Sequence, residues 1–297
     1  MNVERAEECK CFLRKRPSIA YEYAEKTWRS RLADKLRINN PLLRGSVAEF
    51  FSTFILMIFV QGTVASQIFS GQQRDVLLIS IGQGMSVALA VFVSGGVSGA
   101  MLNPAVNFAF LVVGKVTWPV AIFYSIAEYM GAFVASMVIY AVNVENFDKY
   151  DGGLRYTYGP NATAGVFSTF PGEQRSVGGA FFHEAFCTVT LLVGVLAIVD
   201  ERNWKPEKGL IPFAIGGLIC LINLAFSYGE GMAMNPARDL APRLFTLVTH
   251  GTEPFSFWEY NYFWIPVVGS HLGAVVGALL YVIFIEIHHP PQEYVKK

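Results

Sequence analysis

Apolar residues occur along most of the chain in long runs that are separated by short polar stretches. A helix needs about 20 apolar residues to cross the roughly 30 Å hydrocarbon core of a bilayer. Six runs reach this length, and they predict membrane-spanning helices over residues 46–68, 76–97, 118–142, 178–199, 209–228 and 261–285. The pattern therefore predicts an all-α membrane protein with six transmembrane helices.

Two further apolar segments, of about 10 to 12 residues each, are too short to span a bilayer. Each begins with an Asn-Pro-Ala triplet, and asparagine at the cap followed by proline is favourable chemistry for a helix start. Backbone at membrane depth is tolerated outside a full span only where protein buries it or where it lines a watery cavity. We therefore expect two re-entrant half-helices, which begin at Asn103-Pro104-Ala105 and at Asn235-Pro236-Ala237.

The two triplets lie at matching places in an internal repeat. Glu49 precedes Asn103 by 54 residues, and Glu184 precedes Asn235 by 51 residues. The repeat halves cover about 46–142 and 178–285, with three spans in each. Because three is an odd number, the second half is inserted upside down, and the half-helices are expected to meet near the membrane midplane. Such an inverted repeat with broken helices indicates a permeation path.

Composition agrees with a membrane protein, because only 15% of the 297 residues are charged whereas soluble proteins carry about 25%. Lysine plus arginine equals aspartate plus glutamate at 23 each, so no net positive field is present to attract nucleic acid. The four cysteines form no Cys-x-x-Cys pair, and we expect no metal site and no cofactor.

The distribution of basic residues predicts the topology. The first 44 residues hold 11 of the 23 lysines and arginines, which is typical of a segment that stays in the cytosol. With both termini cytosolic, 17 basic residues fall on that side and six elsewhere. The expected organisation is a basic cytosolic tail at 1–44, a channel domain at 45–290 and a cytosolic tail at 291–297.

Paired Asn-Pro-Ala triplets in inverted three-span halves resemble the aquaporins, or major intrinsic proteins. The stretch Asn235-Pro236-Ala237-Arg238-Asp239 is similar to the version found in their glycerol-conducting branch, the aquaglyceroporins, with Asp239 as the marker. The resemblance covers roughly residues 46–290 and implies an aquaporin-type homotetramer in the plasma membrane. It also implies that Glu49 and Glu184 accept hydrogen bonds from the non-helical backbone before each triplet. Glu128 stands where the family usually has glutamine, and we expect it to be protonated or locally paired rather than a proton relay.

The resemblance also assigns a selectivity filter by spacing. The family's aromatic position falls 20 residues before Asn103, on Gln83, and its histidine or glycine position falls 12 residues before Asn235, on Asn223. A loop position falls on Met232, and the family's arginine is Arg238. The missing histidine argues against a strict water filter, and the missing aromatic ring removes the apolar wall expected for glycerol.

These residues predict a passive channel for water and small neutral solutes such as glycerol and urea. The half-helices point their partly positive amino ends at the pore centre, where they repel cations and hydronium. Asn103 and Asn235 offer amide hydrogens to a passing oxygen, and Arg238 adds a fixed charge. The alternative is a water-selective or poorly conducting channel, in which Gln83 and Asn223 bond to each other or to Arg238.

Other classes of membrane protein fit less well. A secondary transporter needs a site for a coupling ion, and the pore segments offer no convergent carboxylates apart from Asp239. An intramembrane enzyme needs a nucleophile and base or a metal cluster, and the five histidines show no such pattern. A purely structural membrane protein is separated from a channel only by measuring flux.

Two modification sites are expected outside the spans. Asn161-Ala162-Thr163 matches the N-glycosylation pattern and lies in the long loop 143–177, which the topology places outside the cell. Arg14, Lys15 and Arg16 precede Ser18, which makes Ser18 a candidate phosphorylation site. The simpler and favoured interpretation of the same tail is a solvated basic segment near anionic lipid headgroups.

Overall fold

The computed structural model describes residues 27–73, 75–172, 175–227, 231–256 and 261–291. The chain divides into two compact units, 1–41 and 42–297. In the first unit, α3 (Trp28–Leu36) is capped by Thr27, whose hydroxyl accepts a hydrogen bond from the Ser30 N–H. The second unit contains the predicted channel segments.

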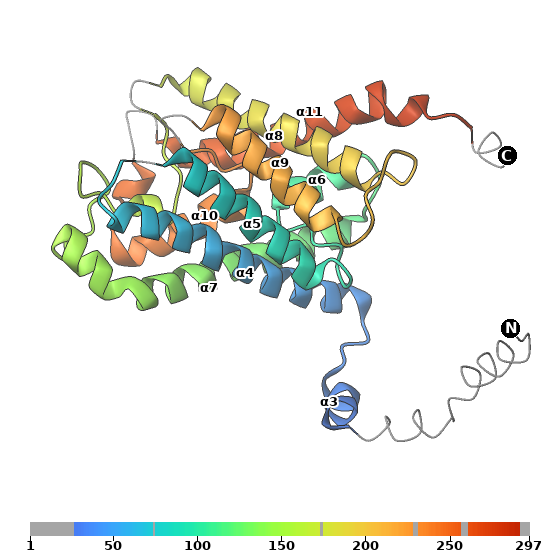
Figure 1. Ribbon diagram of the computed structural model, residues 1–297, viewed down its shortest axis with the longest axis horizontal. Helices are drawn as coiled ribbons and strands as arrows, with labels where there is room; N and C mark the ends of the chain where they lie inside the picture. The colour runs from blue at the N-terminus through green and yellow to red at the C-terminus, as the bar shows by residue number, and fades with distance from the viewer. Residues whose placement is uncertain (1–26, 74, 173–174, 228–230, 257–260, 292–297) are drawn as a thin grey trace, which may run out of the picture. The chain divides into compact units, whose positions relative to one another are not determined.

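Every regular element among the described residues of the second unit is helical, which confirms the all-α class (Figure 1). The α-helices are α4 (Pro41–Phe69), α5 (Val76–Ser94), α6 (Pro104–Val112), α7 (Trp118–Asp151), α8 (Val177–Val199), α9 (Ile211–Phe226), α10 (Pro236–Thr249) and α11 (Ile265–Phe284). Short 3₁₀ turns are η1 (Ala164–Val166), η2 (Glu253–Phe255), η3 (Tyr262–Trp264) and η4 (Glu286–His288).

Five segments are long and apolar enough to cross a membrane: α4, α5, α7, α8 and the continuous stretch Tyr262–His288 around α11. The predicted span 209–228 is instead the 16-residue helix α9, which is about 24 Å long at the usual rise per residue. It begins with Pro212 in its first turn and ends at the Ser227 cap. Apolar composition thus overestimated the length of this span by including residues on both sides of the helix.

Helix α7 runs nine residues past the predicted boundary at 142, to Asp151. The extension is polar, so a criterion based on apolar residues did not include it. Gly152 then ends the helix in the left-handed conformation, with φ of 70°, which glycine adopts without steric cost. Asp148 and Asp151 in the last turn both bind Arg155 in the following loop.

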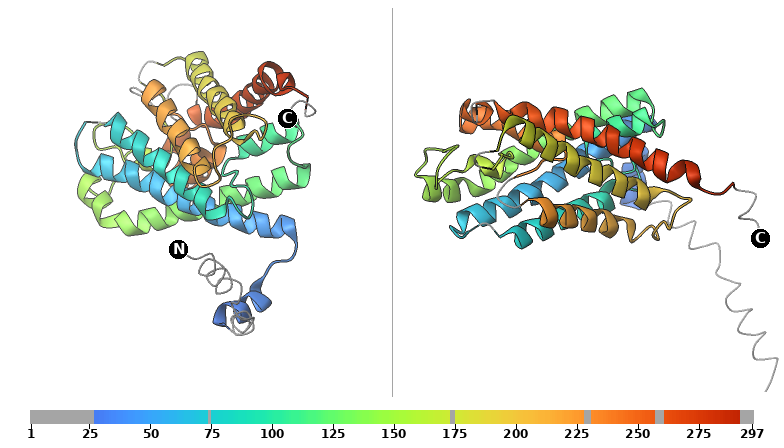
Figure 2. Two further views of the ribbon diagram at one scale, coloured as in Figure 1. Left: turned by 45° about the vertical axis from the view of Figure 1, so that its right-hand side comes forward. Right: turned by 90° about the horizontal axis from the view of Figure 1, so that it is seen from above.

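Corresponding helix pairs of the two repeats pack through glycine. A side chain on Gly131 of α7 would clash with the Phe50 carbonyl of α4, and one on Gly273 of α11 would clash with the Ala185 carbonyl of α8. These contacts allow the backbones to approach closely, as small residues do in membrane helix bundles. Figure 2 shows the long helices running side by side, and the half-helices α6 and α10 each contact α7 and α11.

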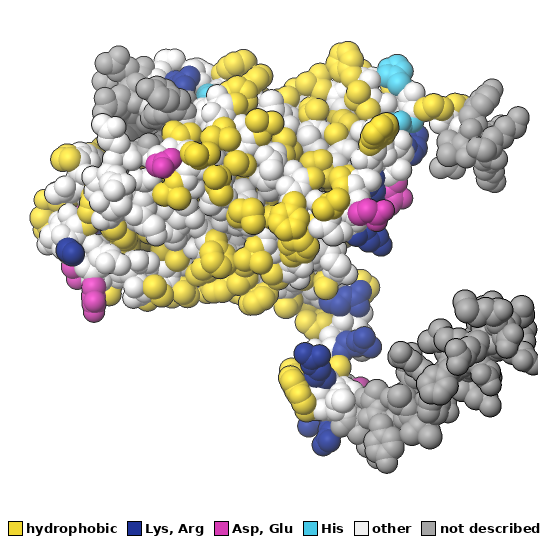
Figure 3. Space-filling view, viewed as in Figure 1, with side chains coloured by type: hydrophobic (Ala, Val, Ile, Leu, Met, Phe, Trp, Pro, Cys, Tyr) yellow, Lys and Arg dark blue, Asp and Glu magenta, His cyan; other side chains and the backbone are white. Residues whose placement is uncertain are grey.

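The outer face of the second unit is apolar. Large side chains such as Phe92 of α5, Leu221 of α9 and Ile283 of α11 are about half exposed or more. The space-filling view shows apolar side chains spread along the helical face, with charged side chains of this unit near its two ends (Figure 3). A surface of this kind suits a hydrocarbon environment.

Candidate pore and selectivity filter

The half-helices α6 and α10 are capped by the asparagines of their Asn-Pro-Ala triplets. The Asn103 Oδ1 atom accepts a hydrogen bond of 2.9 Å from the Ala105 N–H. The Asn235 Oδ1 atom accepts bonds of 3.0 Å from the Ala237 N–H and 3.2 Å from the Arg238 N–H. Because the side-chain oxygens are used in capping, the amide nitrogens point away from the helices that they begin.

Glu49 of α4 holds the segment that leads into α6. Its carboxylate oxygens accept hydrogen bonds of 2.9 Å each from the Met101 and Leu102 N–H groups. Leu102 has φ of 58°, a left-handed conformation that is unfavourable for this residue type. The carboxylate therefore compensates both the missing helical hydrogen bonds and the strained backbone.

Glu184 of α8 does the same for the segment that leads into α10. Its oxygens accept bonds of 3.0 Å from the Ala233 N–H and 2.6 Å from the Met234 N–H, and the Ser270 hydroxyl adds a third bond of 2.7 Å. Met234 has φ of 51°, like Leu102 in the other repeat. The two glutamates thus occupy equivalent positions with equivalent partners.

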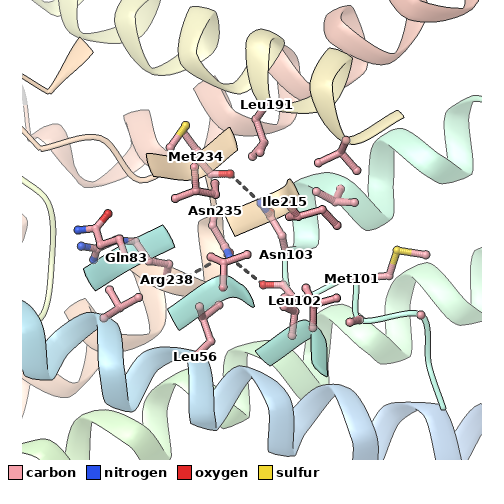
Figure 4. A pocket seen from close by; sticks show the side chains of 18 of the residues that line it. Leu56, Gln83, Met101, Leu102, Asn103, Leu191, Ile215, Met234, Asn235 and Arg238 are labelled. Carbon is pink, nitrogen blue, oxygen red and sulfur yellow. Dashed lines mark hydrogen bonds between the residues drawn. The ribbon is translucent and has the colours of Figure 1, made fainter. Parts of the chain in front are cut away.

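The two half-helices are tied together where they meet. The Asn103 amide donates to the Met234 carbonyl at 2.7 Å, and the Asn235 amide donates to the Leu102 carbonyl at 2.7 Å (Figure 4). Each bond crosses from one repeat to the other. An asparagine amide has two hydrogens. One hydrogen on each side chain is therefore fixed in the protein, and the second remains for another partner.

A cavity of about 270 Å³, here called the apolar cavity, lies beside these asparagines. Asn103, Asn235, Gln83 and Arg238 line it together with mainly aliphatic and aromatic side chains. The apolar members include Val60, Val91, Phe110, Leu191, Val195 and Ile219. The cavity is therefore largely apolar, with a small set of polar side chains at the asparagines and at Gln83 and Arg238.

A second cavity of about 340 Å³, here called the polar cavity, is lined by many more hydrogen-bonding groups. Gln83 and Arg238 line both cavities, so these two residues mark the place where the cavities adjoin. Figure 4 shows their side chains close to one another. Other lining residues of the polar cavity include Gln67, Ser168, Thr169, Asn223, Ser227 and Met232.

All of the residues assigned to the filter by spacing line the polar cavity. The Asn223 amide donates a hydrogen bond of 3.0 Å to the Gln83 carbonyl, so one of the contacts that the sequence left open is made. Arg238 is 8% exposed and donates from Nη1 to the Phe167 carbonyl at 3.3 Å. Met232 is buried, lines the polar cavity and also packs in an apolar core cluster.

Asp239 does not face the passage but supports the half-helix that carries Arg238. Its carboxylate is buried, pairs with Arg243 at 2.9 Å and accepts hydrogen bonds from the Thr169 N–H and hydroxyl. Arg243 also donates to the Thr169 and Pro254 carbonyls, at 2.6 and 2.7 Å. This network fixes the loop whose Phe167 carbonyl holds Arg238.

Sequence reasoning did not include Arg243, Thr169 or Phe167 among the site residues. The spacing of Asp239 and Arg243, four residues apart on one helix, is a signal for their ion pair. The two loop residues carry no comparable signal, because Thr169 contributes through its backbone as well as its hydroxyl and Phe167 contributes only a carbonyl to Arg238.

Comparison with known proteins fits this geometry. The family model "Major intrinsic protein" matches residues 37–281. The chain belongs to the major intrinsic protein family. It is therefore an integral, multi-pass membrane channel of the aquaporin type and not an enzyme, and the resemblance expected from the paired triplets is confirmed.

Individual aquaporins are similar over most of their length. The chain is 48% identical to Aquaporin-8 of Milnesium tardigradum over 259 residues, covering 87% of this chain and 76% of that protein. It is 42% identical to Aquaporin-9 of Homo sapiens over 265 residues, covering 89% and 90%. An X-ray structure of the aquaglyceroporin from Plasmodium falciparum matches with a TM-score of 0.75 and 28% identity, covering 83% of this chain and 98% of that chain.

Glu128, where the aquaporin family usually has glutamine, lies fully buried on α7 against the first half-helix. Its Oε2 atom accepts a hydrogen bond of 2.8 Å from the Asn107 amide, which also donates to the Ser125 hydroxyl. The second oxygen of Glu128 has no hydrogen-bond partner among the described residues. The residue is thus locally paired at one oxygen, and it is not a lining residue of either cavity.

Of the two candidate modification sites, the structure describes only the one at Asn161. Asn161 is exposed, whereas Thr163 of the same pattern is buried and donates its hydroxyl hydrogen to Asp151. Ser18 lies outside the described residues. In the ranges that the structure describes, no group of three or more His, Cys, Asp or Glu side chains is arranged to hold a metal ion.

Proposed function

We propose that the protein is a passive channel that conducts water and small neutral solutes such as glycerol and urea while excluding protons and ions. The observation that carries the proposal is the meeting of the two half-helices. Their capping asparagines bond across the repeat interface and line a passage that adjoins the polar cavity at Gln83 and Arg238.

Exclusion of protons and cations follows from charge and hydrogen-bond direction. Two helix amino ends, each equivalent to about half a positive charge, face the same point in the passage. The free amide hydrogens of Asn103 and Asn235 can both donate to one water oxygen, which turns the hydrogens of that water outward. A water oriented in this way interrupts a uniform proton wire, and the buried charge of Arg238 adds a second barrier.

Conduction of solutes larger than water follows from the side chains at the filter. The family's histidine and aromatic ring are replaced by Asn223 and Gln83, and both are flexible amides. These amides and Arg238 can replace hydrogen bonds that a solute loses when it leaves bulk water. The similarity to human Aquaporin-9 and to the Plasmodium aquaglyceroporin supports the same proposal.

The remaining expectations from the sequence extend this proposal. We assign residues 1–44 and 291–297 to cytosolic tails and residues 45–290 to the channel domain, with both termini on the cytosolic side of the plasma membrane. We assign a homotetramer in the bilayer and glycosylation at Asn161. Exposure of Asn161 supports the last of these assignments.

Stopped-flow light scattering on proteoliposomes tests the function directly. The vesicles are challenged in parallel with an impermeant sugar, with glycerol and with urea, and a pH-sensitive dye inside them records proton entry. We expect fast shrinkage in all three, re-swelling in glycerol and urea, and no proton flux above protein-free vesicles. Absence of water and solute flux in correctly inserted protein, or accumulation of solute against a gradient, would overturn the proposal.

A second candidate function is a water-selective or poorly conducting channel. The hydrogen bond between Asn223 and Gln83 favours it, because two bonded amides occupy space at the junction of the cavities. The same experiment separates the two functions. Shrinkage without re-swelling in glycerol and urea identifies the water-selective channel, and Asn223→Gly is then expected to restore solute entry.

A further inference from the structure

The filter contains a hydrogen-bonded amide pair made by neighbouring helices. Gln83 lies on α5 and Asn223 on α9, and these helices approach closely at Gly84 and Gly216. A side chain on Gly84 would clash with the Gly216 carbonyl, so the close approach depends on glycine. This packing brings the Asn223 amide within 3.0 Å of the Gln83 carbonyl.

The bond between the two side chains leaves a defined set of free groups. Each primary amide has one carbonyl and two N–H donors. The pair uses one N–H of Asn223 and the carbonyl of Gln83, which leaves the Gln83 amino group and the second Asn223 N–H as donors and the Asn223 carbonyl as an acceptor. Reversing the direction of the bond would exchange these roles between the residues, but one free amino group and one free carbonyl would still remain.

Both residues line the polar cavity, and Arg238 contributes further donors to the same constriction. One guanidinium nitrogen of Arg238 is held by the Phe167 carbonyl, and the guanidinium group has five N–H donors in total. A solute in the filter therefore meets donors on Gln83 and Arg238 and an acceptor on Asn223. No aromatic side chain stands at the Gln83 or Asn223 position to cover an apolar edge of the solute.

We propose that the Asn223–Gln83 amide pair makes the filter select planar carboxamides and ureas over polyols of similar size. This inference rests on the proposed function and specifies its preferred solutes. A planar carbonyl oxygen can accept from both Gln83 and Arg238 while an N–H on the same edge donates to Asn223. The CH₂ edge of a polyol that faces this wall leaves amide groups without partners, which disfavours its passage.

The isomers acetamide and N-methylformamide provide a matched pair of probes. Acetamide carries an N–H on the same side as its carbonyl oxygen, so one edge of the molecule offers both a donor and an acceptor. The favoured trans form of N-methylformamide carries its only N–H on the opposite side. Ethylene glycol serves as the polyol of similar size, and protein-free vesicles supply the lipid background for each solute.

We expect wild-type proteoliposomes to pass acetamide roughly fivefold faster than N-methylformamide after background subtraction, as one additional hydrogen bond would give. The near-isosteric variants Gln83→Met and Asn223→Leu should each reduce that ratio to about one, and because both solutes are measured in one preparation the ratio does not depend on the overall flux. Their double variant should lose no more than either single variant, because the pair acts as a unit.

The exchanged double variant Gln83→Asn with Asn223→Gln is the matched control, since it keeps both amides. It should retain a ratio of acetamide flux to N-methylformamide flux well above that of the Gln83→Met and Asn223→Leu variants. A wild-type ratio no higher than one, or an unchanged ratio in Gln83→Met and Asn223→Leu, would overturn the inference. If a single variant does not insert, the wild-type ratio and the exchanged variant decide the question.

The experiment distinguishes failure of this selectivity inference from failure of the proposed channel function. If glycerol and urea pass but the isomer ratio does not respond to the amide pair, only the selectivity inference is wrong. If wild-type protein passes water and none of these solutes, the proposed solute channel itself is wrong. Faster passage of ethylene glycol than of acetamide would contradict the preference for amides while leaving the channel function intact.

Discussion

The two repeats hold their half-helices by the same kinds of hydrogen bond, but the half-helices differ in length and in charge. In both, a buried glutamate binds two backbone N–H groups ahead of the half-helix, and an asparagine caps the helix and bonds to the other repeat. The first half-helix, α6, has nine residues and an uncharged sequence. The second, α10, has 14 residues and carries Arg238, Asp239 and Arg243.

This difference separates the residues that support the half-helices from the charged residues that could act on a passing solute. Support is present in both halves because each broken helix leaves the same backbone groups without helical partners. Of the two half-helices, only α10 carries charged side chains, and these are anchored to the neighbouring loops through Thr169 and Pro254. We therefore expect the fold to depend on the supporting glutamates of both repeats, and discrimination between solutes to depend on Arg238 of α10 together with the Asn223–Gln83 pair.

The largest expected effect concerns Arg243, which has no charged counterpart on α6. The Arg243→Met variant leaves Asp239 buried without its ion pair and frees the carbonyls of Thr169 and Pro254. We expect a loss of about 3–5 kcal/mol in the free energy of unfolding. Thermal unfolding in detergent measures it, with Lys205→Met on an exposed loop as the control. A loss below about 1 kcal/mol would contradict the anchoring role.

The next largest effect tests whether Glu49 and Glu184 support the two repeats equally. Glu49→Gln and Glu184→Gln each replace one accepting oxygen by a donor that faces a backbone N–H. We expect losses of about 2 kcal/mol for Glu49 and about 3 kcal/mol for Glu184, which also binds Ser270.

Glu128→Gln is the matched control for these variants, because the glutamine oxygen can still accept from Asn107. It should change the free energy of unfolding by less than about 1 kcal/mol. Equal large losses in all three variants would show that buried charge, and not the bonds to the broken backbone, is the common cause.

We expect the carboxyl ends of the two half-helices to respond differently to pH. Val113 caps α6, whereas His250 caps α10 and bonds to Thr163 and Thr249 outside the membrane-spanning helices. Burial lowers the pKa of His250 to about 4, from an ordinary value near 6.5. The unfolded chain therefore binds the proton more readily, and the free energy of unfolding should fall as the pH decreases from about 6.5 to about 4.

We expect this decrease to reach about 2 kcal/mol, since His250 is largely shielded from water. Melting temperatures measured between pH 7 and pH 4 report it, and His250→Gln should remove that part of the pH dependence. An identical pH profile in wild type and His250→Gln would show that other groups cause the acid sensitivity.

The smallest effect compares the two caps. Asn103 caps one backbone N–H, whereas Asn235 caps two, including that of Arg238. Asn103→Ser and Asn235→Ser should each cost about 1 kcal/mol in stability, since serine can still cap. Asn235→Ser should allow more proton entry in the dye assay, because it also loosens Arg238. Equal proton entry in both variants would contradict the special role of the second half.

Much of the fold could be predicted because it depends on local chemistry and solvent. Long apolar runs gave the positions of the five spanning segments to within a few residues at most ends, since each run must match the thickness of a bilayer. The helix starts at Asn103 and Asn235 follow from cap and proline preferences. The shortness of α9 and the polar extension of α7 could not be predicted, since capping and loop contacts end those helices.

Patterns along the chain were enough to predict the repeat, the two half-helices and the kinds of side chain at the candidate filter. The fold, by contrast, sets the hydrogen bond from Asn223 to Gln83 and the bonds by which Asp239 and Arg243 hold the Thr169 loop. A hydrogen bond depends on distances of about 3 Å between atoms that are far apart along the chain. Those distances arise from the close packing of α5 on α9 and from the folding of a loop over α10, neither of which a local pattern encodes.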